Sequence, residues 1–266
     1  MKKYMIAIYW FLAVLLTLSA SVYQRMTGPT NPFREKININ NTEYKLKFPR
    51  SAENIDKEVI LNIDKEVDAN IYYRKYPSID DFTEIKFNKK DKKYIATLPV
   101  QPPAGKLEYY IQIDDKTLFK EEPLIIRFKD SVPAWALIPH IIFMFAAMLF
   151  ANYGLIMTFV SKDRFKKYLL ISTALLVIGG FIFGPIVQKF AFGVYWSGFP
   201  LGYDLTDNKT LIALIGLIIS IAFIKKKYSR YIAMLGFILM IGIFCIPHSL
   251  RGSELNHETG VVGTAR

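Results

Sequence analysis

The sequence predicts a membrane α-helical bundle of about five spans joined to an all-β sandwich. Three observations predict this fold class. Long apolar runs dominate residues 133–248, basic residues fill the short segments between those runs, and residues 43–128 alternate apolar and polar side chains. A run of about 20 apolar residues suits a membrane-spanning helix, whereas alternation with a period of two suits half-buried strands.

Five apolar segments are the predicted spans. They cover residues 4–23, about 134–160, about 168–187, about 211–224 and about 231–246. The Lys-Lys pair before the first run also resembles the start of a signal peptide. We interpret residues 1–23 as an uncleaved N-terminal membrane anchor, with a cleaved signal peptide as the alternative.

The positions of the basic residues predict the orientation. They gather in two short loops: Lys162, Arg164, Lys166 and Lys167 in one, and Lys225, Lys226, Lys227 and Arg230 in the other. Positive charge in short loops next to spans marks the cytoplasmic side of a membrane. The N-terminus is therefore predicted inside, with residues 24–132 and the C-terminus outside. Topology and the lipid bilayer explain the net charge of +11, so we expect no nucleic acid as a partner.

Two further features narrow the function. The four C-terminal predicted spans carry almost no ionisable residue at mid-depth, and pumps and transporters usually need such residues. This argues against transport. The chain has one cysteine, Cys245, which excludes an intramolecular disulfide framework.

The region 43–128 holds about seven short strand-like runs separated by turn signals, which predicts a two-layer antiparallel sandwich. Four of these runs, 71–74, 82–85, 94–99 and 104–111, resemble the immunoglobulin-like sandwiches attached to bacterial envelope proteins. The resemblance covers about a third of the chain, and what it implies is a fold.

The predicted organisation follows. It comprises an anchor at 1–23, a linker at 24–42, an extracytoplasmic sandwich at 43–128, a four-helix membrane domain at 134–248 and an extracytoplasmic tail at 249–266.

Histidines near the outer ends of the spans suggest one candidate site. His140 lies near the outer end of the second span and His248 closes the fifth. Cys245, three positions before His248, shares its helix face. Because imidazole is a common ligand, these three residues form a hypothetical haem or transition-metal site. The competing interpretation is that His140 hydrogen-bonds a neighbour and Cys245 packs as a small apolar residue.

Polar and aromatic residues of the outer segments suggest a second candidate, a binding face. Its predicted members are Tyr195, Trp196, Asp204, Asp207, Lys209, Arg251, Glu254 and His257. The competing interpretations are an interfacial aromatic belt for the rings and an N-cap role for Asp207 or Thr206. We assign no catalytic residue.

The segments 23–30, 196–210 and 246–255 resemble uncharacterised bacterial multi-pass inner-membrane proteins that carry an immunoglobulin-like extracytoplasmic domain. The resemblance implies a bacterial envelope setting and supplies no reaction. The leading hypothesis is a cytoplasmic-membrane protein that binds or assembles with an envelope protein at its extracytoplasmic face. The alternative is a haem- or metal-binding redox protein, and a third hypothesis is a membrane-embedded hydrolase. Whether the protein is an enzyme stays open.

Overall fold

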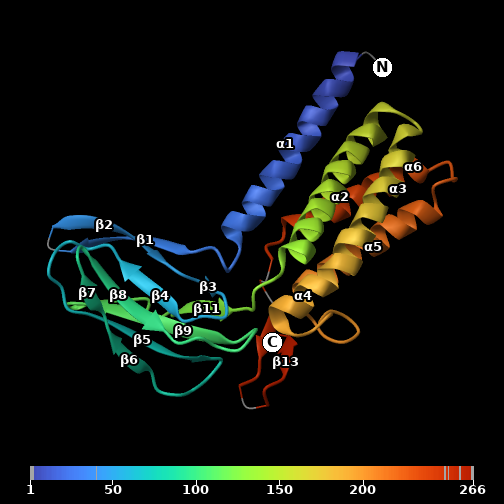
Figure 1. Ribbon diagram of the computed structural model, residues 1–266. Helices are drawn as coiled ribbons and strands as arrows, with labels where there is room; N and C mark the ends of the chain where they lie inside the picture. The colour runs from blue at the N-terminus through green and yellow to red at the C-terminus, as the bar shows by residue number, and fades with distance from the viewer. Residues whose placement is uncertain (1–2, 40, 249, 251, 258, 265–266) are drawn as a thin grey trace. The chain divides into compact units, whose positions relative to one another are not determined.

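The computed structural model describes residues 3–39, 41–248, 250, 252–257 and 259–264 (Figure 1). The chain forms two compact units, and each is described by itself. Unit 1 comprises Met1–Gly28, Val132–Gly252 and Thr264–Arg266, and unit 2 comprises Pro29–Ser131 and Ser253–Gly263. Most of the C-terminal segment therefore belongs to unit 2, although the helices of unit 1 separate it from the rest of unit 2 along the chain.

Unit 1 is helical. Its helices are α1 (Lys3–Thr27), α2 (Ala134–Val160), α3 (Arg164–Leu176), the π-helix η1 (Val177–Phe183), α4 (Gly184–Phe192), α5 (Leu205–Ala222) and α6 (Ser229–Cys245). The segments α3, η1 and α4 follow one another without a break. Helix α2 packs on α3, and α5 packs on α6 (Figure 1).

Helix α1 is packed into this bundle by specific contacts. The Trp10 ring stacks on Tyr153 of α2, with ring centroids 4.0 Å apart. The side-chain amide of Asn152 donates a 2.9 Å hydrogen bond to the Thr17 hydroxyl, and both residues are buried. A buried amide needs such a partner, and α1 supplies it for Asn152.

Unit 2 contains strands in several sheets. The strands are β1 (Phe33–Ile39), β2 (Thr42–Phe48), β3 (Ser51–Ala52), β4 (Lys57–Leu61), β5 (Ala69–Tyr76), β6 (Thr83–Lys86), β7 (Asn88–Lys90), β8 (Lys93–Leu98), β9 (Lys106–Ile113), β10 (Lys116–Leu118), β11 (Leu124–Phe128), β12 (Ser253–Leu255) and β13 (Val262–Thr264), whose last residue lies in unit 1. The largest sheet has the order β3-β11-β9-β5-β6, with β10 on β9. A second sheet has the order β4-β8-β7, and β1 with β2 and β12 with β13 form two-stranded sheets.

Alternating apolar side chains build the core of unit 2. On β9, Leu107, Tyr109, Ile111 and Ile113 all point inward and are buried. The Tyr109 hydroxyl donates a 2.8 Å hydrogen bond to the carbonyl of Pro49. Burial raises the pKa of Tyr109, which keeps the hydroxyl protonated as a donor. The core cluster draws its buried residues from the β1–β11 part of the chain.

The predicted fold class is wrong in two respects. Within the described residues, four helical segments are long and apolar enough to cross a membrane, not about five: α1, α2, Arg164–Phe192 and α5. Helix α6 is apolar but shorter, with 17 residues. In place of the predicted antiparallel immunoglobulin-like sandwich, the β region has a mixed six-stranded sheet, in which β3 pairs parallel with β11, and smaller sheets. Alternation locates strands but does not specify their partners.

The segments expected to be linker and tail also contain strands. Strand β1 occupies Phe33–Ile39 and pairs with β2 along its full length, inside the range 24–42 expected to be a linker. The range 249–266 contains β12 and β13. Strands β12 and β13 have three residues each, too few for an alternating pattern, whereas β1 alternates over seven residues within the range predicted to be a linker.

Candidate functional site

The α4–α5 loop, residues 193–204, is held by the first turn of α5. Asp204 is the N-cap of that helix, and its Oδ1 accepts hydrogen bonds from the backbone N–H groups of Thr206 at 2.7 Å and Asp207 at 3.4 Å. Such a cap satisfies donors that have no partner within the helix. The sequence had suggested Asp207 or Thr206 as the cap. The helix begins earlier, which leaves Asp207 free for another role.

Two side chains of α5 bind the loop backbone. Asp207 Oδ2 accepts from the backbone N–H of Ser197 at 2.7 Å and from its hydroxyl at 3.3 Å. Gln188 of α4 donates to the same hydroxyl at 2.6 Å. The neighbouring Asn208 Oδ1 accepts from the backbone N–H of Phe199 at 2.6 Å. Because all these partners sit on helices, the loop conformation is fixed.

Two glycines allow the loop to lie this close to α5 and to itself. A Cβ atom at Gly198 would come 2.6 Å from the Cβ of Asp207, and one at Gly202 would come 2.4 Å from the carbonyl oxygen of Ser197. Neither contact is tolerable without moving backbone or helix, so both positions require glycine.

Apolar side chains project from this fixed backbone. We define the apolar loop face as Tyr195, Phe199, Leu201 and Tyr203, whose exposed fractions are 60%, 65%, 77% and 80%. Trp196 lies beneath them: it is half-buried, stacks on Phe181 and donates from its indole N–H to the carbonyl of Phe199 at 3.1 Å. The loop thus combines a fixed backbone with exposed apolar groups.

Lys209 caps the C-terminal end of α6. Only 2% of the residue is exposed, and its Nζ donates to the carbonyl of Ile246 at 2.7 Å. Gln24, near the end of α1, donates to the same carbonyl at 3.1 Å and to that of Phe244 at 2.7 Å. Carbonyls at a helix C-terminus lack partners within the helix and carry partial negative charge. Lys209 and Gln24 satisfy them, so α1, α5 and α6 meet at this point.

His140 and His248 lie within electrostatic range of each other. His140 Nδ1 is 2.9 Å from the carbonyl oxygen of Gly179 in η1. Since a carbonyl only accepts, Nδ1 carries the proton in this contact. The pKa of His248 is lowered, first by desolvation and then by the positive charges of Lys209 and His140. His248 is exposed, so the repulsion from Lys209 and His140 is the more relevant cause, and it indicates that the three groups lie near one another.

These contacts give little support to a metal at this position. Cys245 is half-buried and packs against the core of unit 1. In the part of the chain that the structure describes, no group of three or more His, Cys, Asp or Glu side chains lies close enough to hold a metal ion. The ammonium of Lys209 would also repel a cation bound to His248. The haem or metal hypothesis stays a prediction, to be tested by a Soret band and by metal analysis of the purified protein.

The predicted outer-face residues fall into two groups. Tyr195, Trp196, Asp204, Asp207 and Lys209 belong to unit 1, whereas Glu254 and His257 belong to unit 2. Arg251 lies outside the described residues. Glu254 forms an ion pair with Lys106, and His257 interacts with the backbone of Tyr76 and Lys106.

The prediction missed the residues that fix the loop. Gln188, Ser197 and Asn208 carry uncharged side chains with no motif around them, and Gln24 lay in a presumed linker. One signal was present: Gly198 and Gly202 bracket an aromatic and a proline in a short loop, a spacing typical of a tightly folded turn.

The chain was compared with models of known protein families and with curated proteins, and neither comparison finds a match.

Proposed function

We propose that the chain is an integral protein of a bacterial cytoplasmic membrane that binds an envelope partner protein through the α4–α5 loop. The four long apolar helices support membrane insertion. So do the large apolar side chains that the helices leave uncovered, such as Phe11 at 67% and Leu235 at 62% exposed, because soluble proteins rarely expose wide apolar surfaces.

The orientation follows from charge. The basic clusters lie at the α2–α3 connection with the first turn of α3, and at the α5–α6 connection with the start of α6, which favours the cytoplasmic side for both. The α4–α5 loop and unit 2 then lie on the extracytoplasmic side. Unit 2 contains both Pro29–Ser131 and Ser253–Gly263, so an extracytoplasmic unit 2 requires the shorter apolar helix α6 to reach across the membrane as well.

The binding role rests on one observation: a backbone fixed from two helices presents the apolar loop face to the outside. Aromatic anchors are enriched among the residues that dominate binding energy. A surface that is already ordered avoids the entropy cost of ordering on association. A loop needed only to connect α4 with α5 would not require Asp207, Asn208 and Gln188 to hold it.

The competing interpretation is an aromatic belt at the membrane interface. Belt residues contact lipid head groups and need no particular loop conformation. A binding face depends on that conformation, because its side chains must match a partner. The two interpretations therefore predict different effects when the loop is loosened without changing its aromatic residues.

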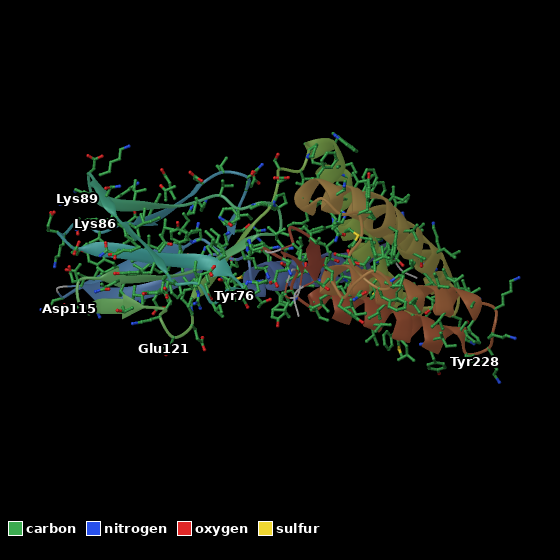
Figure 2. The ribbon with its side chains drawn as sticks, turned by 90° about the horizontal axis from the view of Figure 1, so that it is seen from below. Tyr76, Lys86, Lys89, Asp115, Glu121 and Tyr228 are labelled. Atoms are coloured by element: carbon green, nitrogen blue, oxygen red, sulfur yellow. The ribbon has the colours of Figure 1, made fainter. Side chains whose placement is uncertain are left out.

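The test is photo-crosslinking in native membranes, with a photoreactive residue at Tyr203 and a matched control at Tyr228. Tyr228 is also exposed, at 50%, and sits between α5 and α6 at the far end of unit 1 (Figure 2). We expect one discrete protein adduct at Tyr203, none of the same mass at Tyr228, and loss of the adduct in Asp207→Ala.

Lipid adducts alone at Tyr203, unchanged by Asp207→Ala, would favour the belt and overturn the binding role. Membrane extraction with carbonate tests the insertion itself: release of the full chain into the soluble fraction would contradict it.

A further inference from the structure

The C-terminal segment docks on a part of unit 2 that is already complete. Residues Ser253–Gly263 belong to unit 2, yet the described core cluster of that unit contains only residues between Ile37 and Phe128, with its partly buried neighbours in the same region. The segment therefore adds to a finished surface rather than closing the core. The segment thus binds unit 2 as a peptide ligand would, although it is part of the same chain.

A largely buried ion pair holds the segment. Glu254 pairs with Lys106 of β9, and their side chains are only 17% and 13% exposed. The Lys106 ammonium also lies 5.6 Å from the ring centroid of Tyr76 on β5. Exposed ion pairs contribute little because water screens them. A shielded pair matters more, since removing one partner leaves the other charge buried and uncompensated.

The residues on either side of Glu254 are bound as well. Arg127 of β11 donates from Nη2 to the carbonyl of Ser253 at 2.7 Å. The backbone N–H of Leu255 donates to the carbonyl of Ala104 at 3.1 Å. The Leu255 side chain is 7% exposed, and its Cδ2 would lie 3.6 Å from a Cβ built on Gly105, an ordinary van der Waals distance.

These contacts define the tail groove: Tyr76, Ala104, Gly105, Lys106 and Arg127. Three consecutive residues are each recognised, one by its carbonyl, one by its carboxylate and one by its N–H and apolar side chain. The groove lies at the Tyr76 end of unit 2, and Lys86 and Lys89 lie at the opposite end (Figure 2). Recognition of an extended segment by backbone hydrogen bonds plus side-chain contacts is a common way to bind peptides.

We propose that the tail groove is a reversible docking site for the chain's own tail, recognised as an extended segment with a carboxylate residue, Glu254, followed by a large apolar residue, Leu255. The positive Lys106 and Arg127 complement the carboxylate and the carbonyl of such a segment. This inference goes beyond the proposed function, because the groove belongs to unit 2 and not to the α4–α5 loop.

The test measures binding of a fluorescent peptide covering residues 252–264 to the full chain in detergent. The first receptor is the Glu254→Lys variant, in which Lys106 repels the lysine of the chain's own tail. The second receptor ends at residue 252 and has no tail. We expect both to bind the peptide, and wild type to bind it at least about thirtyfold more weakly because its tail competes. Lys106→Glu in the receptor that ends at residue 252 should reduce binding by roughly thirtyfold, the cost of losing one partner of a buried pair.

Reversing both charges tests whether binding depends on the ion pair between residues 106 and 254. A peptide carrying lysine in place of Glu254 should recover binding to a Lys106→Glu receptor. The matched control is Lys86→Glu, which alters an exposed ion pair with Asp68 at the other end of unit 2 and should leave affinity unchanged. A folded tail-free receptor that does not bind the peptide, or that binds it without regard to the charge at Lys106, would overturn the inference. Loss of the Tyr203 adduct with peptide binding intact would refute only the proposed function.

Discussion

Lys209 and Gln24 donate hydrogen bonds to the same oxygen atom, the carbonyl of Ile246, at 2.7 Å and 3.1 Å. One donor comes from α5 and the other from α1. When one donor is removed, the other still donates a hydrogen bond to this carbonyl at the end of α6.

This sharing predicts a coupled loss of stability. Gln24→Ala and Lys209→Met should each cost about 1 kcal/mol, whereas the double variant should lose more than the sum, by about 1 kcal/mol, because the carbonyl is then unsatisfied. Unfolding in detergent followed by circular dichroism measures this. Gln24→Ala combined with Ser220→Ala, whose hydroxyl bonds elsewhere, to Gly216 and Ile232, should be additive. Additivity in the Gln24–Lys209 pair would contradict the shared cap.

The α4–α5 loop should lose its order when its α5 contacts are removed. Asp207→Ala leaves the buried N–H of Ser197 without its acceptor, which costs about 1–3 kcal/mol, so hydrogen exchange across residues 193–204 should accelerate. Tyr203→Ala removes an exposed ring but keeps the hydrogen bonds between Asp207 and the loop, so hydrogen exchange should stay unchanged. Equal exchange in wild type and Asp207→Ala would show that the loop is ordered by something else.

Helix α1 should remain in the mature protein. Its Thr17 hydroxyl is the partner of the buried Asn152 amide, and its Gln24 caps α6. Cleavage after about residue 23 would remove Thr17 and strand that amide inside the bundle. Intact-mass analysis of the purified protein should therefore include the residues of α1. A mass lacking them would make α1 a signal peptide. Thr17→Val should lower stability by about 0.6 kcal/mol, the typical value for such bonds in membrane proteins.

Docking of the tail should weaken in mild acid. The pKa of His257 is lowered in the docked state, chiefly by desolvation and next by the charge of Lys75, while the backbone of Tyr76 and Lys106 and the carboxylate of Glu254 oppose the shift. A lowered pKa means that docking favours the neutral ring. This contribution is full above the ordinary histidine pKa of about 6.5 and is lost as pH falls through the lowered value.

Hydrogen exchange of residues 253–257 at pH 7.5 and pH 5.5, corrected for intrinsic rates, measures that effect. Protection should be lower at pH 5.5 in wild type and independent of pH over this window in His257→Asn. Ordinary carboxylates stay ionised over this window, which isolates the histidine. Protection that rises at pH 5.5 would reverse the sign and contradict the argument.

The sequence predicts individual helices and strands well, because the local pattern of apolar residues determines them. The apolar run of α2 and the alternation along β9 each identify an element, because period and burial follow from a few neighbouring residues. The parallel pairing of Arg127 with Ser51 and of Phe128 with Ala52 depends on residues far apart in the chain, which no local pattern encodes.

The candidate site shows the same division. The sequence singled out Asp204, Asp207 and Lys209 because they lie with aromatic residues in a predicted outer segment. Their roles depend on distant partners: Lys209 reaches Ile246, and Asp207 holds Ser197 across a loop. The grouping of Glu254 with them was suggested by chain position, whereas its bound partner, Lys106, lies in the β-rich unit.

The division of unit 2 into two stretches of chain bears on the order of synthesis. Residues up to 131 emerge first and include the whole described core of that unit, so it can fold while the later helices are still being made, as domains commonly do during translation. The segment Ser253–Gly263 is made only after α6. Its docking in the tail groove can therefore occur only after α2–α6 have been synthesised.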